Sequence, residues 1–345
     1  MISFAKAVIG RKEQNAVQRV LASGWLTMGE ETVKFEEEFA AFVGTKEAIA
    51  VNSCTAGLFL SLKALGIGKG DEVIVPSLTF IATANVVLHT GAIPVFADVS
   101  DDTWTLDPKD VERVRTKRTK AVIPVHYAAR KAYIDYDLPV VEDSAHLIDK
   151  KCASGNVTAY SFYATKNITT GEGGMVTTND KAIASWLRKA RLHGMSRDAW
   201  KRYGVKGKWQ YDVEFPGFKY NMIDINAALG RVQLQRLPRL NEKRDKLVGY
   251  YNKLLQLQNT GNHLYPILVK KRDKFMNYMT EKGIQCSVHF LPVHLMSAYK
   301  SYKVNLPVTE YIGERVVTLP LHPLLTKKDI EYIADCVNAY KKKYE

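Results

Sequence analysis

The chain has 345 residues, of which 46% are hydrophobic, so it can bury a large core and is long enough for two domains. No segment approaches the roughly 18 uninterrupted apolar residues of a membrane span. Residues 1–10 are too short and too weakly apolar for a signal peptide. The sequence therefore predicts a cytoplasmic protein without a membrane segment. The cysteines show neither CxxC spacing nor a neighbouring histidine pair, which favours free thiols over disulfides or a metal site: Cys54, Cys152, Cys286 and Cys336.

The net charge is +13, with a pI near 9.3. A basic chain can bind nucleic acid or an anionic substrate, or simply be soluble. Its basic clusters, at residues 113–120, 188–208 and 341–343, are not interleaved with aromatic residues, and no nucleic-acid-binding motif is present. We therefore expect no nucleic-acid partner, and we read the first and third clusters as solvated surface.

The pattern of apolar residues predicts an α/β fold. Residues 33–66 follow a helical pattern, in which Phe35, Phe39 and Phe42 recur on one side. Short runs rich in β-branched residues then alternate with helical stretches and predict buried strands at residues 73–76, 94–97, 121–125 and 139–141. This alternation predicts a mainly parallel sheet that is covered by helices on both faces. Ligands of such sheets bind beyond the carboxyl ends of the strands.

The C-terminal part has a different character. A long helical pattern covers residues 223–255, residues 283–290 read as a strand, and residues 329–341 read as a terminal helix. We place a large domain at residues 1–240 and a smaller α+β domain at residues 241–345.

Two residues are candidates for contact with a reactive ligand. Asp143 ends an apolar strand, where a carboxylate can meet a ligand, although an aspartate that merely starts a turn is the simpler explanation. Lys166 lies in a mostly uncharged stretch, between a short strand ending near Ser161 and a glycine-rich turn. A partly buried lysine of this kind is what Schiff-base chemistry requires.

Two further segments could bind other parts of the same ligand. Small hydroxyl residues around Thr55 open an apolar helix, where free N–H groups can bind a phosphate, and Ser161 can add a hydroxyl. Phe80 falls at a strand-to-helix junction, as a core residue or as a ring that stacks on a flat cofactor. An aldehyde for Lys166, a ring nitrogen for Asp143, a phosphate and a flat face together describe pyridoxal 5'-phosphate.

The chain resembles the DegT/DnrJ/EryC1/StrS family of sugar aminotransferases, within the fold-type-I, aspartate-aminotransferase-like superfamily. The resemblance rests on many motifs in the right order, at residues 24–29, 52–57, 70–77, 91–98, 142–146, 161–174, 191–203, 220–228, 288–294 and 319–323. It implies the fold of that superfamily, a seven-stranded-type, mainly parallel sheet sandwiched by helices with a small C-terminal domain.

The resemblance also implies residue roles. Lys166 carries the cofactor and, once displaced by the amino donor, acts as the base, while Asp143 pairs with the pyridine nitrogen. The other implied cofactor contacts are His146 near the ring, Phe80 stacked on it, Cys54, Thr55 and Ser161 at the phosphate, and Asn221 reaching the phosphate from the partner subunit. The active site would therefore need a homodimer. Trp25 and Thr27 match a loop that borders the substrate.

Members of this family usually aminate a keto sugar linked to a nucleoside diphosphate, with glutamate as the expected amino donor. The segment 218–228 looks more like members that act at C4 than at C3, and the basic segment 188–208 could face the diphosphate or be plain surface. Amination of a 3-keto sugar or of an inosose, and a non-catalytic regulatory or binding protein on the same fold, remain alternatives. Dehydratase relatives replace the lysine with histidine, and Lys166 argues against them.

Three stretches look short for the family. The crossover between His126 and Asp143 leaves room for little more than two helical turns. The intervals from His146 to Ser161 and from Tyr251 to His263 are also reduced. These losses put loop-borne substrate contacts in doubt more than the cofactor site.

Overall fold

The computed structural model describes residues 1–150, 155–196 and 211–344. Its helices are α1 (Arg11–Ser23), α2 (Glu30–Val43), α3 (Cys54–Ala64), α4 (Ala82–His89), α5 (Pro108–Val114), α6 (Lys181–Ala190), α8 (Asp224–Leu255), α9 (Arg272–Glu281), α10 (Pro307–Arg315) and α11 (Lys327–Tyr344). Its strands are β1 (Glu47–Val51), β2 (Glu72–Pro76), β3 (Ile93–Ala97), β4 (Thr119–Val122), β5 (Val141–Ser144), β6 (Val157–Ser161), β7 (Gly174–Thr178), β8 (Tyr265–Leu268) and β9 (Val316–Leu319). Short 3₁₀ turns lie at Tyr127–Ala129, Val293–Leu295 and Ser297–Tyr302.

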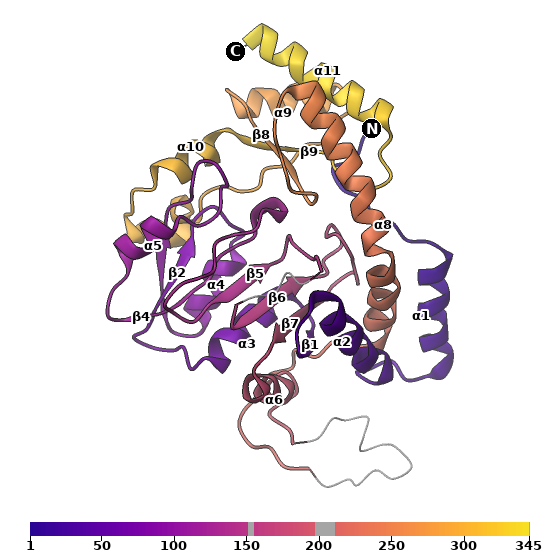
Figure 1. The fold of residues 1–345 in the computed structure, drawn as a ribbon, viewed down its shortest axis with the longest axis vertical. Helices are drawn as coiled ribbons and strands as arrows, with labels where there is room; N and C mark the ends of the chain where they lie inside the picture. The colour runs from indigo at the N-terminus through magenta and orange to yellow at the C-terminus, as the bar shows by residue number, and fades with distance from the viewer. Residues whose placement is uncertain (151–154, 197–210, 345) are drawn as a thin grey trace.

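The central sheet is mainly parallel, as the sequence predicts. One part has the order β1-β7-β6-β5 and the other has the order β3-β2-β4. Parallel bridges from Val122 to Val140 and from Val125 to Asp143 join the two parts into one surface (Figure 1). Strand β7 runs antiparallel to both of its neighbours, whereas β2 is parallel to β3 and β4, and β5 is parallel to β6.

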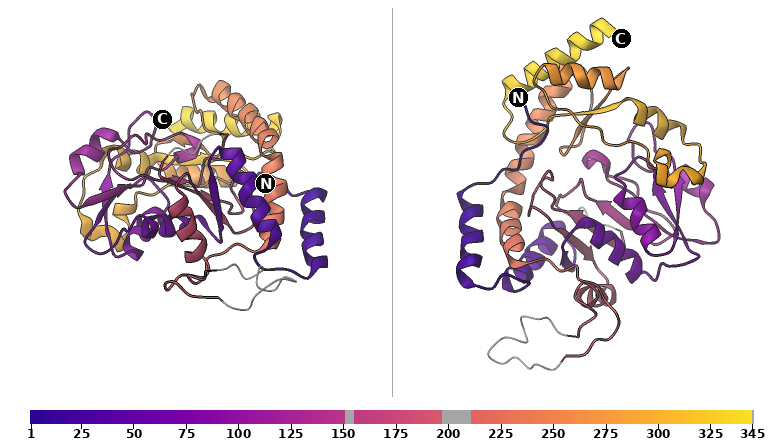
Figure 2. Two further views of the ribbon diagram at one scale, coloured as in Figure 1. Left: turned by 60° about the horizontal axis from the view of Figure 1, so that its bottom comes forward. Right: turned by 180° about the vertical axis from the view of Figure 1, so that it is seen from behind.

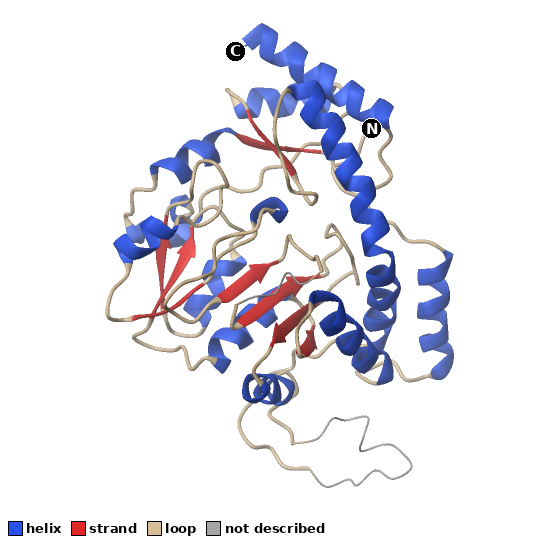
Figure 3. Ribbon diagram, in the orientation of Figure 1, coloured by secondary structure: helices blue, strands red, loops and turns tan. Residues whose placement is uncertain are grey.

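Helices cover both faces of this sheet (Figure 3). Strand β1 shows how: Ala48 and Ala50 pack with Phe35 and Phe39 of α2, whereas Ile49 and Val51 enter a second core with α3 and α6. Successive side chains of a strand point to opposite faces, so both faces of a buried strand must be apolar. The predicted α/β architecture is confirmed.

Two local predictions are wrong. The helical pattern at residues 33–66 is interrupted by β1, because a short buried strand flanked by two helices has no periodicity of its own. Residues 283–290 form no strand and make only isolated bridges, Ile2 to Ile284 and Ser287 to Thr318. The crossover after His126 is short, as the sequence predicts: it contains the 3₁₀ turn Tyr127–Ala129 and no α-helix.

The long helix α8 connects the sheet with the C-terminal part of the chain, as both Figure 1 and the reversed view in Figure 2 show. Leu234 and Leu237 of α8 pack in the core beneath α2, whereas Leu247, Val248 and Tyr251 pack with β8, β9, α9 and α11. The change of partners falls between these two groups, inside a continuous helix. We propose that the two domains meet there, near residue 240.

Among the described residues, no helix is long and apolar enough to cross a membrane.

Candidate active site

A cavity of about 580 Å³ lies beyond the carboxyl ends of β5 and β6. The described residues that line it include seven of the predicted cofactor residues: Cys54, Thr55, Phe80, Asp143, His146, Ser161 and Lys166. These residues are up to 112 positions apart in the sequence. The sheet brings them together because the carboxyl ends of its parallel strands lie at the same edge.

Asp143 is the third residue of β5 and is 5% exposed. Its Oδ2 accepts a hydrogen bond from Thr83 Oγ1 at 2.8 Å, and its Oδ1 accepts one from the Ala145 amide at 3.1 Å. Burial raises the pKa of Asp143, although these hydrogen bonds and the nearby Lys166 favour the ionised form. A buried carboxylate facing a cavity in this way is suited to a cationic ligand group.

Lys166 follows β6 by five residues and is partly buried against the same cavity. Burial lowers the pKa of Lys166 to about 8, while Cys54 and Asp143 favour its protonated form. A pKa near 8 leaves a useful fraction of free amine at neutral pH, which a nucleophilic lysine needs.

The opposite end of the cavity is formed by the first turn of α3. Ser53 caps this helix, its Oγ accepting a hydrogen bond from the Ala56 amide, and Cys54 and Thr55 follow as the first helical residues. Amides of a first helical turn have no partner within the helix and bind anions. Gly174 of β7 allows close approach here, because a Cβ on Gly174 would lie 2.6 Å from the Cys54 nitrogen.

Aromatic rings line the remaining walls. Phe80 is 59% exposed, so it is not the core aromatic that was the simpler interpretation, and its ring lies 6.1 Å from that of Phe290. His146 stacks on Phe290 with ring centroids 5.7 Å apart and lies 4.6 Å from His263. An exposed ring that faces a cavity can stack on a flat ligand.

The histidines of the cavity are neutral near pH 7. Burial lowers the pKa values of His146 and His263 well below the usual value, and burial and Lys166 lower that of His289 to about 4. The Ala128 amide donates to His146 Nδ1 at 3.3 Å, so the proton of neutral His146 lies on Nε2. His146 can therefore donate a hydrogen bond through Nε2.

Three predicted site residues do not line this cavity in their own chain: Trp25, Thr27 and Asn221. Trp25 is partly exposed and Thr27 is exposed. Asn221 is 7% exposed, its amide donates to the Met222 carbonyl at 3.2 Å, and its backbone pairs with Val51 just before α3.

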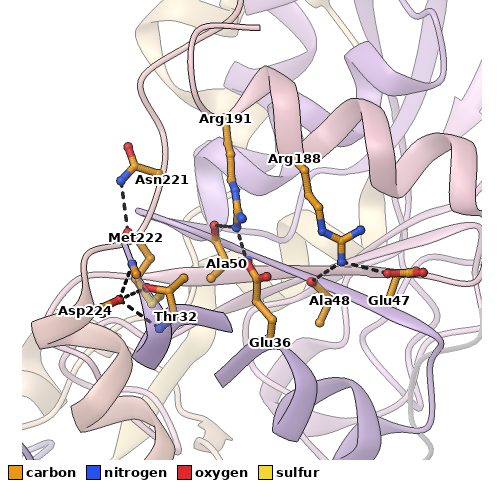
Figure 4. Close-up of polar contacts among 11 residues, drawn as sticks. Thr32, Glu36, Glu47, Ala48, Ala50, Arg188, Arg191, Asn221, Met222 and Asp224 are labelled. Atoms are coloured by element: carbon orange, nitrogen blue, oxygen red, sulfur yellow. Dashed lines mark hydrogen bonds and ion pairs between the residues drawn. The ribbon is translucent and has the colours of Figure 1, made fainter. Parts of the chain in front are cut away.

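The strand that leads into α3 is held by two arginines of the α6 region (Figure 4). Arg191 donates to the Ala50 carbonyl at 2.7 Å and forms a buried ion pair with Glu36, whose carboxylate accepts the Ala50 amide at 2.8 Å. Arg188 pairs with Glu47 at 2.8 Å. Because β1 lies at the edge of the sheet, these side chains satisfy backbone groups that no neighbouring strand pairs.

These pairs also bear on the basic segment 188–208. Arg188 and Arg191 are paired with carboxylates, and Lys189 pairs with Glu214 at 2.6 Å. Residues 197–208 of this segment lie outside the described residues.

Sequence reasoning missed several residues that line the cavity or support its lining. Thr83 holds Asp143, and Thr83 and Thr79 are hydrogen-bonded to each other at 2.8 Å. His263, His289 and Phe290 come from the C-terminal part of the chain. The motif at 288–294 signalled the last two, but nothing in the sequence places His263 beside His146.

Comparison with known proteins agrees with this geometry. The chain matches the DegT/DnrJ/EryC1/StrS aminotransferase family over residues 7–338. The chain belongs to this family. It is 43% identical to the uncharacterized protein MJ1066 of Methanocaldococcus jannaschii, over 97% of this chain and 95% of that protein. It is 42% identical to the spore coat polysaccharide biosynthesis protein SpsC of Bacillus subtilis, over 97% of this chain and 96% of that protein.

Among solved structures, the putative sugar aminotransferase Spr1654 of Streptococcus pneumoniae in its PMP form superposes with a TM-score of 0.92 and 31% identity, covering 99% of this chain and 100% of that chain. The protein is thus a sugar aminotransferase of the DegT family with a fold-type-I architecture, and its cofactor is pyridoxal 5'-phosphate. The alignment with MJ1066 spans 372 residues, more than this chain contains, so the relative carries residues that this chain lacks. The shortened stretches are consistent with that difference.

The residues present fit this cofactor. Asp143 is a buried carboxylate that faces the cavity, the first turn of α3 leaves amides for a phosphate, and Phe80 exposes a ring face. The free amine of Lys166 completes the set.

Proposed function

We propose that this enzyme converts a nucleotide-linked keto sugar, a 4-keto-6-deoxyhexose, to the corresponding amino sugar with glutamate as the amino donor. The observation that carries the proposal is one cavity in which Lys166, with a pKa near 8, meets the buried Asp143. A non-catalytic protein would have no need to keep both groups in a buried site, where each is desolvated.

Each side chain has a distinct task in this proposal. When bound, pyridoxal phosphate supplies an electron sink that carries the amino group from donor to acceptor. Asp143 keeps a proton on the ring nitrogen, because a buried carboxylate stabilises a cation beside it. The hydrogen bonds from Thr83 and the Ala145 amide favour the ionised form of that carboxylate and fix its position at the cavity.

Lys166 holds the cofactor covalently through Nζ and then acts as the base. Once the donor amine has displaced it, Nζ would take a proton from the substrate carbon that bears the nitrogen and deliver it to the carbon on the other side of that nitrogen. The pKa near 8 suits both directions of this transfer, because neither the protonated nor the neutral amine is strongly favoured near pH 8.

The remaining residues bind and orient. Cys54, Thr55 and Ser161 hold the phosphate, Phe80 covers one ring face, and His146 lies beside the ring with its Nε2 proton. Because burial lowers the pKa values of His146, His263 and His289, these histidines do not take the proton from Lys166.

We further propose that the active enzyme is a homodimer. Asn221 does not line the cavity of its own chain, and the family pattern assigns it to the phosphate of the partner's site. Trp25 and Thr27 border the substrate.

The deciding experiment mixes the enzyme, glutamate and a panel of UDP-, dTDP- and GDP-linked 4-keto-6-deoxy sugars, with product masses as the readout. We expect one nucleotide sugar of this panel to gain an amino group, and 3-keto sugars and inososes, tested in parallel reactions, to remain unchanged. If an inosose or a 3-keto sugar is aminated instead, the sugar assignment is wrong.

Absorbance tests the cofactor assignment separately. The purified protein should show the visible band of a lysine-bound cofactor, and Lys166→Ala should lose it. Lys246→Ala is the matched control, because Lys246 is exposed and pairs with Glu242 on the surface of α8. A band that survives in Lys166→Ala would contradict the role of this lysine.

A further inference from the structure

His146 and His263 lie side by side in the wall of the cavity, with ring centroids 4.6 Å apart. Within the described part of the chain, the hydrogen bonds of both rings run through Nδ1. His146 Nδ1 accepts from the Ala128 amide, and His263 Nδ1 lies 2.8 Å from Asn167 Oδ1. The Nε2 edge of each ring is therefore left for a ligand. What that edge offers depends on which nitrogen of the ring carries the proton.

The side-chain amide of Asn167 decides this for His263. Its Nδ2 donates to Asn241 Oδ1 at 3.2 Å and to Asn262 Oδ1 at 3.3 Å. Because both of these atoms are acceptors, the nitrogen of the Asn167 amide must face them and its oxygen must face His263. An amide oxygen only accepts hydrogen bonds, so the proton of neutral His263 lies on Nδ1 and its Nε2 is unprotonated.

Two charged residues fix the direction of this chain of amides. The guanidinium of Arg244 has only donors, and its Nη1 donates to Asn241 Oδ1 at 3.0 Å. The carboxylate of Asp245 has only acceptors, and its Oδ1 accepts from Asn262 Nδ2 at 3.0 Å. Turning over any one amide would place two donors or two acceptors opposite each other and lose a hydrogen bond. We call these five residues the amide relay: Asn167, Asn241, Arg244, Asp245 and Asn262.

Arg244 also connects the relay to the lysine. Arg244 is 6% exposed, and its Nη2 donates at 3.0 Å to the backbone carbonyl of Asn167, the residue directly after Lys166. Burial, followed by the charges of Lys166 and Arg244, lowers the pKa of His263 well below its usual value, so the ring stays neutral. The amide relay thus keeps an uncharged imidazole with an unprotonated Nε2 at the cavity.

The two rings therefore present opposite groups to a ligand. His146 offers an N–H and His263 offers a lone pair, and neither carries a charge. A carboxylate or a phosphate only accepts hydrogen bonds and an ammonium group only donates them, whereas a hydroxyl group does both. The phenolic hydroxyl of pyridoxal phosphate is acidic and largely ionised at neutral pH, so it has no proton to donate to His263. An alcohol of a sugar keeps its proton and meets both requirements.

We propose that a ring hydroxyl of the sugar donates to Nε2 of His263 and accepts from Nε2 of His146, and that the amide relay sets the tautomer that this requires. The inference rests on the proposed function, which supplies a sugar as the substrate. His263 is then a specificity-determining residue, and Asn167 and Arg244 are positioning residues. A site built to pair with a hydroxyl discriminates strongly against an analogue that lacks it.

Two amide substitutions separate the two edges of the His263 ring. In His263→Asn, the new amide nitrogen lies where Nδ1 was, so the bond to Asn167 is kept and the Nε2 edge is lost. The KM for the keto sugar should rise about tenfold, while the Kd for pyridoxal phosphate and the rate of the spectral change with glutamate alone stay at wild-type values. His263→Gln should keep more of the sugar affinity but lower the melting temperature, because its amide reaches the Nε2 position and loses Asn167.

The matched control is His89→Asn, because His89 is exposed on α4, and it should leave every value unchanged. An unchanged KM in His263→Asn would show that the imidazole is merely structural and would overturn the inference. A weaker Kd for pyridoxal phosphate with an unchanged KM for the sugar would overturn it as well, since His263 would then serve the cofactor.

Sugars that each lack one ring hydroxyl identify the group that is bound. One such analogue should bind wild-type enzyme on the order of tenfold more weakly than the parent keto sugar, and this difference should largely vanish in His263→Asn. If no analogue shows a difference that depends on His263, the inference is wrong while the proposed function stands. A wild-type enzyme that aminates no keto sugar overturns the proposed function and the inference with it.

The tautomer gives a readout that needs no activity. In the cofactor-loaded enzyme with isotope-labelled histidine, nuclear magnetic resonance should find the proton of His263 on Nδ1 and that of His146 on Nε2, with each ring assigned by its loss in His263→Asn or His146→Asn. In Asn167→Leu, the His263 proton should no longer prefer Nδ1, and the melting temperature shows whether the variant is folded. A His263 proton on Nε2 in the wild type, or an unchanged tautomer in folded Asn167→Leu, would contradict the role of the amide relay.

Discussion

The hydrogen bond from Thr83 to Asp143 offers a sharp test of the cofactor site. Thr83→Val keeps the shape of a buried side chain and removes only the hydroxyl, which lies 2.8 Å from Asp143 Oδ2. A hydrogen bond to a charged group contributes roughly 1.5 to 3 kcal/mol. Because the Ala145 amide still holds the other carboxylate oxygen, we take the lower end of that range.

The loss should appear in cofactor affinity. Without the hydroxyl, the pKa of Asp143 rises further, and the carboxylate holds a proton on the ring nitrogen less well. A loss of about 1.4 kcal/mol corresponds to tenfold weaker binding. Titration of cofactor-free protein with pyridoxal phosphate, followed by absorbance, should therefore give a Kd roughly ten times that of the wild type.

Thr83→Ser is the control, because it keeps the hydroxyl and loses only a methyl group. Melting temperatures of the cofactor-free variants show whether either change disturbs the fold, since Thr79 also loses its partner in Thr83→Val. If Thr83→Val and Thr83→Ser bind the cofactor with equal affinity, the hydroxyl does not support Asp143 and the reasoning is refuted.

Three more predictions concern Lys166, Arg191 and Gly174. The rate of cofactor capture, measured by stopped-flow absorbance, should rise about tenfold from pH 6 to pH 7 and level off above pH 8. The reason is that the pKa of Lys166 in the folded protein is near 8 and only its free amine reacts. A rate that instead rises steadily to pH 10 contradicts this pKa. Arg191→Met should lower the free energy of unfolding by roughly 3 to 5 kcal/mol in urea, because it leaves Glu36 buried without its partner, and the added change Glu36→Gln should recover part of the loss; strictly additive losses would show that the two side chains are not coupled. Gly174→Ala should weaken cofactor binding by displacing the first amide of α3, whereas Gly249→Ala, where a Cβ meets nothing within 4 Å, should leave binding unchanged; equal binding by both variants would remove the argument from close approach.

Much of the fold could be predicted because buried parallel strands leave a local mark. The runs at β2 and β3 are apolar, β-branched and bounded by turn residues, and the structure places strands there. The 32 residues of α8 also have a helical pattern that the sequence shows. In contrast, β1 has five residues between two helices, and its strand character comes from pairing with β7, which lies more than a hundred residues away.

The cofactor residues could be predicted for a related reason. Asp143 lies near the carboxyl end of β5, whereas Lys166 and the start of α3 follow β6 and β1, and these strand ends share one edge of the sheet. Local sequence therefore predicts both the chemistry and its place.

The sequence by itself thus determined the type of fold and the cofactor, and it predicts the lysine that would bind it, because these depend on short segments whose residue types are dictated by backbone geometry and by chemistry. Only the tertiary structure decided what supports them. Thr83 behind Asp143, His263 beside His146, and Arg244 behind Asn167 are contacts between segments distant in sequence. Such contacts depend on packing between segments that are distant in sequence. The side chain must match the shape and charge of its neighbour, and this match leaves no pattern in the local sequence.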